Sequence, residues 1–324
     1  EKIEKIIAKI DSDPESEEVK EAEKHLWEKI YKKSGQGRRT GVGITAEGDM
    51  LAAMGLRYGT EEATEFSEQV HKTIALEAYR SSVNMAKERG AFAIYDSERE
   101  KNNPFINRLK EADPELYEEM KKYGRRNIAC LTIAPTGTTS LMTQTTSGIE
   151  PVFMPVYKRR RKVNPNDPQT HVDFVDETGD AFEEYIVFHH KFVEWMTVNG
   201  YDPTKRYTQE EIDKLVEKSP YYKATSNDVD WLMKVKMQGR IQKWVDHSIS
   251  VTINLPNDVD EALVNRLYVE AWRSGCKGCT VYRDGSRSGV LLSTKKDKKD
   301  KKEELPPCKP PTVVEVRPKV LEAE

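Results

Sequence analysis

Apolar residues recur every three or four positions through most of the first half of the chain, and this spacing predicts helices. The first segment, residues 1–34, is charged and helical, with a break near Asp13 and Pro14. The same spacing predicts further helices over residues 17–33, 50–56, 61–88 and 104–123. The longest of these directs the following side chains inward: Val70, Ile74, Ala78 and Val83.

Three shorter segments predict strands. Residues 128–134 form an almost uncharged apolar run, which indicates a buried strand. Residues 248–255 alternate between polar and apolar side chains, the period of a strand, and another strand is expected to begin at Thr280. Strands that alternate with helices, without an internal repeat, favour an α/β fold with helices outside and parallel strand pairing.

Two more helices are expected in the second half of the chain. Residues 225–239 resemble a helix capped by the aspartates before Trp231. Residues 180–199 contain His189 and His190, which would point in different directions on a helix, so a structural role is favoured over a shared metal site. This second helix is expected to carry four aromatic residues on one side: Tyr185, Phe188, Phe192 and Trp195.

A hydroxyl-rich turn follows the first predicted strand. Pro135 ends the strand, Gly137 permits a tight turn, and a helix is expected to start at Ser140. Free N–H groups at a helix start, next to several hydroxyls, suit an anion such as phosphate. A helix cap is the equally weighted alternative on the pattern alone, since no GxxxxGK[ST] motif is present. The candidate phosphate-binding residues are Pro135, Thr136, Gly137, Thr138, Thr139 and Ser140.

Four segments together resemble the ribonucleotide reductase large subunit. PTGTTSLMTQTTSGIEP at residues 135–151 is similar to the phosphate-loop segment of that family. VDHSISVTINLP at residues 245–256 and AWRSGCKGCTVYRDGSRSGVL at residues 271–291 are similar to its later barrel segments. GRRTGVGITAEGDMLAAMGLRYGT at residues 37–60 resembles a further family segment. Within the family, the PTGT-type loop, the GCKG element and the YRDGSR ending are most similar to the adenosylcobalamin-dependent class II.

The resemblance implies the C-terminal part of a ten-stranded α/β barrel that reduces ribonucleotides to deoxyribonucleotides by radical chemistry. The family's radical cysteine lies in an Asn-x-Cys-x-Glu motif, which is absent here, so no catalytic residue is expected in this chain. The chain also begins at Glu1 without a methionine, so it is interpreted as a piece that is inactive alone. A further group is implied to line the same end of the barrel: Gly148, Ile149, Glu150 and Pro151.

The family resemblance also implies a cofactor and partners. The cofactor is expected to be adenosylcobalamin, and the substrate a ribonucleotide. The expected protein partners are the N-terminal half of the same enzyme, a thioredoxin-like or glutaredoxin-like reductant and, for the full-length form, a second copy in a homodimer. Tyr282 stands without the adjacent tyrosine found in reductases that import a radical from a second subunit. This favours a radical generated by the cofactor.

Cys276 and Cys279 form a CxxC pair that has two possible chemical roles, as a redox dithiol or as half of a zinc site. A second CxxC is missing, and the remaining cysteines are single and distant, so no metal site is expected. The pair precedes a predicted strand instead of a helix start. A packing role is therefore favoured over a redox role.

The charge and hydropathy of the sequence argue against a nucleic-acid-binding or membrane protein. A net charge of −3 with 33% charged residues gives no general attraction to nucleic acid or membrane. No apolar run approaches the roughly 20 residues of a membrane-spanning helix, and the charged N-terminus does not resemble a signal peptide, so the cytoplasm is expected. Residues 158–162 are all basic, and a solvated surface is favoured over nucleic-acid binding for them.

Four regions are expected along the chain. Residues 1–34 form a helical lead-in, and residues 35–294 form the barrel portion. Residues 295–312 are rich in lysine and proline and predict a flexible basic linker. Residues 313–324 resemble the start of a truncated C-terminal module.

Two alternative functions compete with the reductase. One is a phosphate-binding enzyme of another class, such as a phosphosugar isomerase or lyase on a smaller α/β barrel, which would not explain GCKG and YRDGSR. The other is a non-catalytic nucleotide-binding relative of a reductase. The coding sequence upstream of Glu1 distinguishes this relative from the reductase, because an Asn-x-Cys-x-Glu motif there would support the enzyme.

Overall fold

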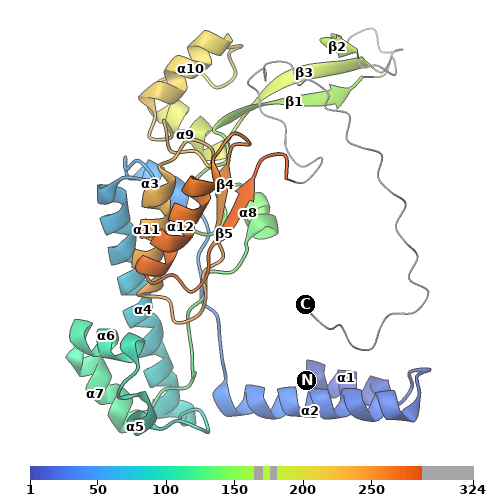
Figure 1. Cartoon of the computed structure of the whole chain (residues 1–324), viewed down its shortest axis with the longest axis vertical. Coiled ribbons are helices and arrows are strands. Elements are labelled where there is room, and N and C mark those ends of the chain that lie inside the picture. The colour runs from blue at the N-terminus through green and yellow to red at the C-terminus, as the bar shows by residue number, and fades with distance from the viewer. Residues whose placement is uncertain (164–170, 176–180, 287–324) are drawn as a thin grey trace. The chain divides into compact units, whose positions relative to one another are not determined.

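The computed structural model describes residues 1–163, 171–175 and 181–286 (Figure 1). Helices dominate the first half, and three antiparallel and two parallel strands follow. The helices are α1 (Lys2–Ile10), α2 (Glu17–Gly37), α3 (Glu47–Ala53), α4 (Glu61–Arg89), α5 (Ser97–Glu100), α6 (Pro104–Ala112), α7 (Pro114–Tyr123), α8 (Gly137–Thr143), α9 (His190–Val198), α10 (Gln209–Lys218), α11 (Trp231–Gln242) and α12 (Glu261–Arg273). The strands are β1 (Val156–Lys162), β2 (Phe174–Val175), β3 (Ala181–Phe188), β4 (Thr252–Leu255) and β5 (Thr280–Arg283).

Helix α4 is the longest helix and confirms the prediction for residues 61–88. It packs against α11 and α7, and its most buried side chains repeat every four residues through Ser67, His71, Ala75 and Tyr79. This line is rotated by one position from the predicted inward residues, of which Val83 alone is fully buried.

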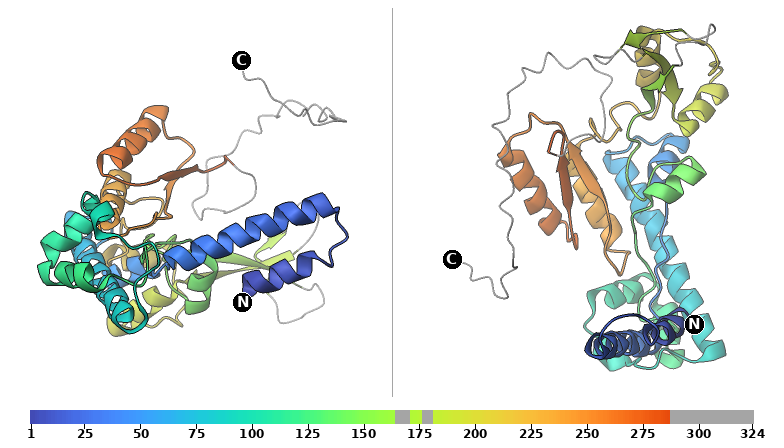
Figure 2. Two further views of the ribbon diagram at one scale, coloured as in Figure 1. Left: turned by 90° about the horizontal axis from the view of Figure 1, so that it is seen from below. Right: turned by 90° about the vertical axis from the view of Figure 1, so that its right-hand side faces the viewer.

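Helices α11 and α12 lie next to the parallel strands β4 and β5, as Figure 2 shows. Val235 of α11, Ile253 of β4 and Leu267 of α12 meet in one apolar cluster. The Asp230 side chain caps α11 by accepting a hydrogen bond from the Met233 N–H, as the sequence predicted. Parallel pairing of β4 with β5 confirms that prediction, although β4 is shorter than the predicted strand.

The expected helix over residues 180–199 is wrong in its first half. Residues 181–188 form strand β3, which pairs antiparallel with β1 and β2, and only α9 is helical. The apolar spacing that suggested one helix spans a strand followed by a helix. Pairing with the basic strand β1 decides the conformation, because the ladder satisfies the backbone of both strands.

The predicted strand at residues 128–134 is a largely buried segment, but it pairs with its neighbours only through isolated bridges. Val42 bridges to Leu131, and Ile133 bridges to Ile249, both in parallel. Gly43 lies so close to this segment that an added Cβ would meet the Thr132 carbonyl oxygen at 2.3 Å. Strands β4 and β5 and the isolated bridges are parallel, whereas β1, β3 and β2 form a separate antiparallel sheet, and the described strands do not close into a barrel.

The predicted linker at residues 295–312 and the predicted module at residues 313–324 lie outside the described residues, as does the end of the predicted barrel region at residue 294. Over the ranges that are described, no helix combines the length and the apolar character needed to cross a bilayer.

Candidate functional site

Helix α8 begins at Gly137, three residues before the predicted start. Its first hydrogen bond runs from the Ser140 N–H to the Thr136 carbonyl oxygen at 2.7 Å. The N–H groups of Gly137, Thr138 and Thr139 therefore lie in the first turn, where a helix offers them no acceptor. The predicted turn and helix are both present, but Gly137 belongs to the helix itself.

The six predicted phosphate-binding residues divide into two groups. The Thr136 hydroxyl accepts the Gly148 N–H at 2.7 Å and lies 3.0 Å from the Ser147 hydroxyl. The Ser140 side chain is buried and donates to the Gly137 carbonyl oxygen at 3.0 Å. Both hydroxyls therefore stabilise the loop internally.

Thr138 and Thr139 form the second group, together with Pro135 and Gly137, because all four are exposed. Among the described residues, no hydrogen bond uses the Thr138 or Thr139 hydroxyl. The adjacent Leu141 and Met142 side chains are 80% and 83% exposed, which is unusual for two consecutive large apolar residues. This end of the segment therefore exposes both hydrogen-bond donors and apolar surface.

Residues 148–151, predicted to line the same end of a barrel, lie directly beside the start of α8. Gly148 adopts a φ of +49°, and its N–H reaches Thr136. Ile149 is 1% exposed and belongs to the same apolar cluster as Leu131 and Ile133, and Pro151 is also buried. Glu150 is half-buried, and its Oε1 accepts the Thr252 N–H at 3.0 Å. Of the four side chains, the Glu150 carboxylate is the one placed to act as a polar group.

The Cys276 and Cys279 side chains are half-buried against the apolar cluster of α11, α12 and β4. Burial raises the pKa of the Cys276 thiol to about 12, and burial also raises the pKa of Cys279. A thiol with a raised pKa is a poor nucleophile at neutral pH. These environments support the packing role over the redox role.

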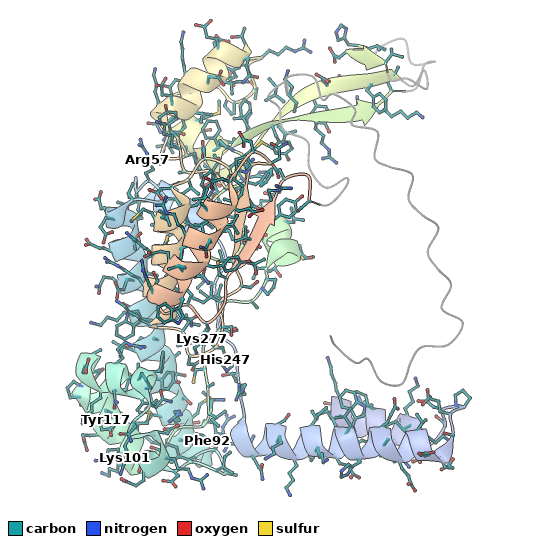
Figure 3. All side chains as sticks on the ribbon, viewed as in Figure 1. Arg57, Phe92, Lys101, Tyr117, His247 and Lys277 are labelled. Carbon is teal, nitrogen blue, oxygen red and sulfur yellow. The ribbon has the colours of Figure 1, made fainter. Side chains whose placement is uncertain are left out.

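The loop that carries both cysteines is held by hydrogen bonds to α11 and to the segment that follows α11. The Gln238 amide donates to the Gly278 carbonyl oxygen at 2.8 Å, and the Cys276 thiol lies 3.8 Å from the Val235 carbonyl oxygen. Lys277, which is labelled in Figure 3, donates to the Asp246 carbonyl oxygen.

His189 and His190 occupy different positions, as expected for adjacent residues. His189 precedes α9, and its Nε2 lies 2.8 Å from the Asp49 carboxylate, whereas the His190 side chain is exposed. Among the described ranges, no group of three or more His, Cys, Asp or Glu side chains is arranged to hold a metal ion.

The basic residues 158–162 form strand β1, and Arg161 pairs with Glu183 of β3 at 2.6 Å. This pairing across the ladder agrees with the favoured interpretation of a solvated surface.

Three buried charged side chains have no recognisable signal in the sequence. Asp49 is 5% exposed, Glu47 is fully buried within 3.4 Å of His71, and Lys234 is 1% exposed. Burial lowers the pKa of Lys234 to about 8, and its ammonium donates to the Thr252 carbonyl oxygen at 2.6 Å. In the sequence these residues resemble ordinary surface charges, and only the fold shows that they are buried.

Two cavities of the described residues do not fit a large cofactor. One is a surface groove of about 490 Å³, which is lined mainly by the glutamates of α4 together with Arg240. The other is an internal cavity of about 10 Å³ beside His71, which has room for no more than one water molecule. Neither provides the broad apolar cradle that a corrin ring needs.

A protein-family model described as "Ribonucleotide reductase, barrel domain" matches residues 17–282. The vitamin B12-dependent ribonucleoside-diphosphate reductase of Mycobacterium tuberculosis strain CDC 1551 is 30% identical over 79% of this chain and 33% of its own length. A protein of the same name from Thermoplasma acidophilum is 30% identical over 89% of this chain and 34% of its own length. The chain thus spans about a third of the length of these relatives.

The structure is similar to that of the class Id ribonucleotide reductase alpha subunit from Actinobacillus ureae, with a TM-score of 0.52. That similarity covers 78% of this chain and 40% of the other, at 16% identity, so it concerns the fold.

Proposed function

This chain belongs to the ribonucleotide reductase barrel-domain family, and we propose that it supplies the substrate phosphate-binding loop of a reductase that makes deoxyribonucleotides. It would form the C-terminal part of a ten-stranded barrel that the described strands leave open. The family match argues against the smaller phosphosugar barrel. Because the chain spans only about a third of its relatives, the catalytic residues are assigned to the remainder of the enzyme.

The observation that carries this proposal is the pair of exposed hydroxyls, Thr138 and Thr139, in the first turn of α8. Each can donate to a phosphate oxygen, beside backbone N–H groups that the helix leaves without acceptors. The Thr136 hydroxyl holds the start of this turn in place through its contacts with Ser147 and Gly148. A rigid anchor for the phosphates would place the ribose at a defined distance from the reacting groups.

We assign adenosylcobalamin to the complete enzyme because relatives are named as vitamin B12-dependent. When bound, this cofactor supplies a radical. The two cavities described above do not fit a corrin, so none of the described residues is assigned to holding it. The other proposed partners are a ribonucleotide, the N-terminal part of the enzyme, a thioredoxin-like or glutaredoxin-like reductant and a second copy of the enzyme.

The test is the double variant Thr138→Val/Thr139→Val. Each lost donor to a charged ligand costs about 1.5 to 3 kcal/mol, so the KM for a ribonucleoside diphosphate is expected to rise by about 100-fold or more. Turnover is measured with the chain joined to the reductase segments that its relatives carry beyond the matched region. Thr73→Val, at an exposed position of α4, is the matched control and is expected to leave KM unchanged. An unchanged KM in the double variant would refute the phosphate role.

A further inference from the structure

Asp49 is a buried carboxylate that connects three other parts of the chain to α3. Its Oδ2 accepts the Thr146 N–H at 2.8 Å. Its Oδ1 accepts the Tyr221 hydroxyl at 3.0 Å and lies 2.8 Å from the His189 Nε2. Thr146 follows α8, His189 precedes α9, and Tyr221 follows α10. One side chain therefore links the segment after the phosphate loop to two helices far away in the sequence.

Thr146 receives an unusual number of hydrogen bonds from a single short segment. Besides the bond to Asp49, its hydroxyl accepts the Asp49 N–H at 3.3 Å. Its carbonyl oxygen accepts the Ala46 N–H at 2.9 Å and the Thr45 hydroxyl at 2.8 Å. The Thr45 hydroxyl also lies 3.3 Å from that of Thr136, so residues 45–49 hold both the start and the end of the segment that contains α8.

The donors around Asp49 are matched to a carboxylate. Burial and the negative charge of Asp49 raise the pKa of Tyr221 well above its usual range, so its hydroxyl keeps the proton and donates. Because an ionised carboxylate only accepts hydrogen bonds, the His189 ring, 15% exposed, is assigned the tautomer that donates from Nε2. The two rings meet edge to face with centroids 6.1 Å apart, which restricts both to this arrangement.

We propose that Asp49, oriented by His189 and Tyr221, is a positioning residue for the phosphate loop. It holds Thr146 in place and thereby fixes the first turn of α8 relative to the substrate phosphates. This inference rests on the proposed function of residues 135–140. Without this support the loop becomes mobile but still holds the phosphates in the same bound position, so the ribose stays in place. Phosphate binding then weakens equally in the ground state and the transition state, which raises KM and leaves kcat unchanged.

The experiment measures the Kd of the chain for inorganic pyrophosphate by calorimetry, and KM and kcat in the joined reductase. Asp49→Asn is expected to raise Kd and KM about tenfold, with kcat within about twofold. His189→Gln keeps an N–H donor and is expected to bind nearly as the parent does, whereas His189→Leu is expected to resemble Asp49→Asn. Tyr221→Phe removes one donor and is expected to raise Kd by about threefold. Equal behaviour of His189→Gln and His189→Leu would contradict a positioning role.

Combining Asp49→Asn with Thr138→Val/Thr139→Val separates the two proposals. Unchanged binding in the threonine double variant refutes the phosphate loop itself. Weakened binding in that variant, with normal binding in Asp49→Asn, refutes only the positioning role. Weakening in both, with a combined effect smaller than the product of the two, supports action of Asp49 through the loop. A combined effect equal to the product contradicts it. If Asp49→Asn does not fold, the Tyr221→Phe and His189 variants decide.

Discussion

The two ends of the buried segment at residues 128–134 are built in opposite ways. Before its start, the Arg125 guanidinium contacts both Glu100 oxygens at 2.5 Å and donates to the Asn127 and Ile128 carbonyl oxygens at 3.1 Å. It also lies 5.4 to 5.7 Å from three aromatic ring centroids, including that of Phe92, which Figure 3 labels. Arg125 is only 2% exposed. Every polar contact at this end is made within the chain.

The other end, at the start of α8, presents unpaired donors and apolar surface instead. Thr138 and Thr139 are exposed, and Leu141 and Met142 lie beside them. The segment thus begins in a closed region, where the polar groups are paired within the chain. It ends in an open region, where hydroxyls and apolar side chains are exposed. The difference predicts that stability depends on one end of these seven residues and the proposed phosphate binding on the other, so variants at the two ends should affect different measurements.

The largest expected effect is at the closed end. Arg125→Met leaves Glu100 without its partner, and breaking a buried ion pair in this way costs about 3 to 5 kcal/mol. The free energy of unfolding in urea measures the loss. Arg126→Ala removes a neighbouring arginine that donates to the Arg89 and Gly90 carbonyl oxygens, and it is expected to cost only about 1 kcal/mol. Comparable losses in the two variants would remove the distinction between the two ends.

An intermediate effect is expected at the buried Lys234, whose ammonium donates to the Thr252 carbonyl oxygen. Its pKa falls from 10.5 to about 8 through burial, so the unfolded chain binds more protons between these values. Stability is therefore expected to rise with pH from about 8 to about 10.5, by at most about 3 kcal/mol. This contribution is fully present above the unfolded pKa and is lost as pH falls through the folded pKa.

The measurement compares urea unfolding of the parent chain and Lys234→Met at several pH values. The difference between them should shrink or reverse as pH rises, whereas exposed Lys236→Met should show no such trend. A flat difference for Lys234→Met would show that the buried amine keeps its ordinary proton affinity.

The smallest expected effect is on stability at the open end. Thr138→Val/Thr139→Val should change the free energy of unfolding by less than about 0.5 kcal/mol, because the described residues give these exposed hydroxyls no partner. Thermal unfolding of the chain measures this value. A large loss of stability would mean that the hydroxyls serve the fold, as those of Thr136 and Ser140 do.

Sequence patterns predicted the elements whose conformation depends on neighbouring residues in the sequence. The long periodic helix α4, the cap of α11 and the turn before α8 follow from residue spacing and capping side chains. Strand β3 was predicted as helix because its partner β1, not its own spacing, determines its conformation.

The supports of the candidate site could not be predicted in the same way. The sequence shows the loop threonines, but Thr136 and Thr138 look alike until the fold brings Gly148 to one of them. Asp49 bonds to Thr146 and Tyr221, which are 97 and 172 positions away in the sequence. No local sequence pattern indicates contacts over such separations.

The close contact between Gly43 and Thr132 makes the residue at position 43 informative when related sequences are compared. Since a Cβ would stand 2.3 Å from a backbone oxygen, a side chain at this position requires the two extended segments to separate. A related chain that carries alanine or a larger residue here should therefore show a rearranged pairing between these segments. The residue at this one position thus indicates which distant relatives share the close approach of the two segments.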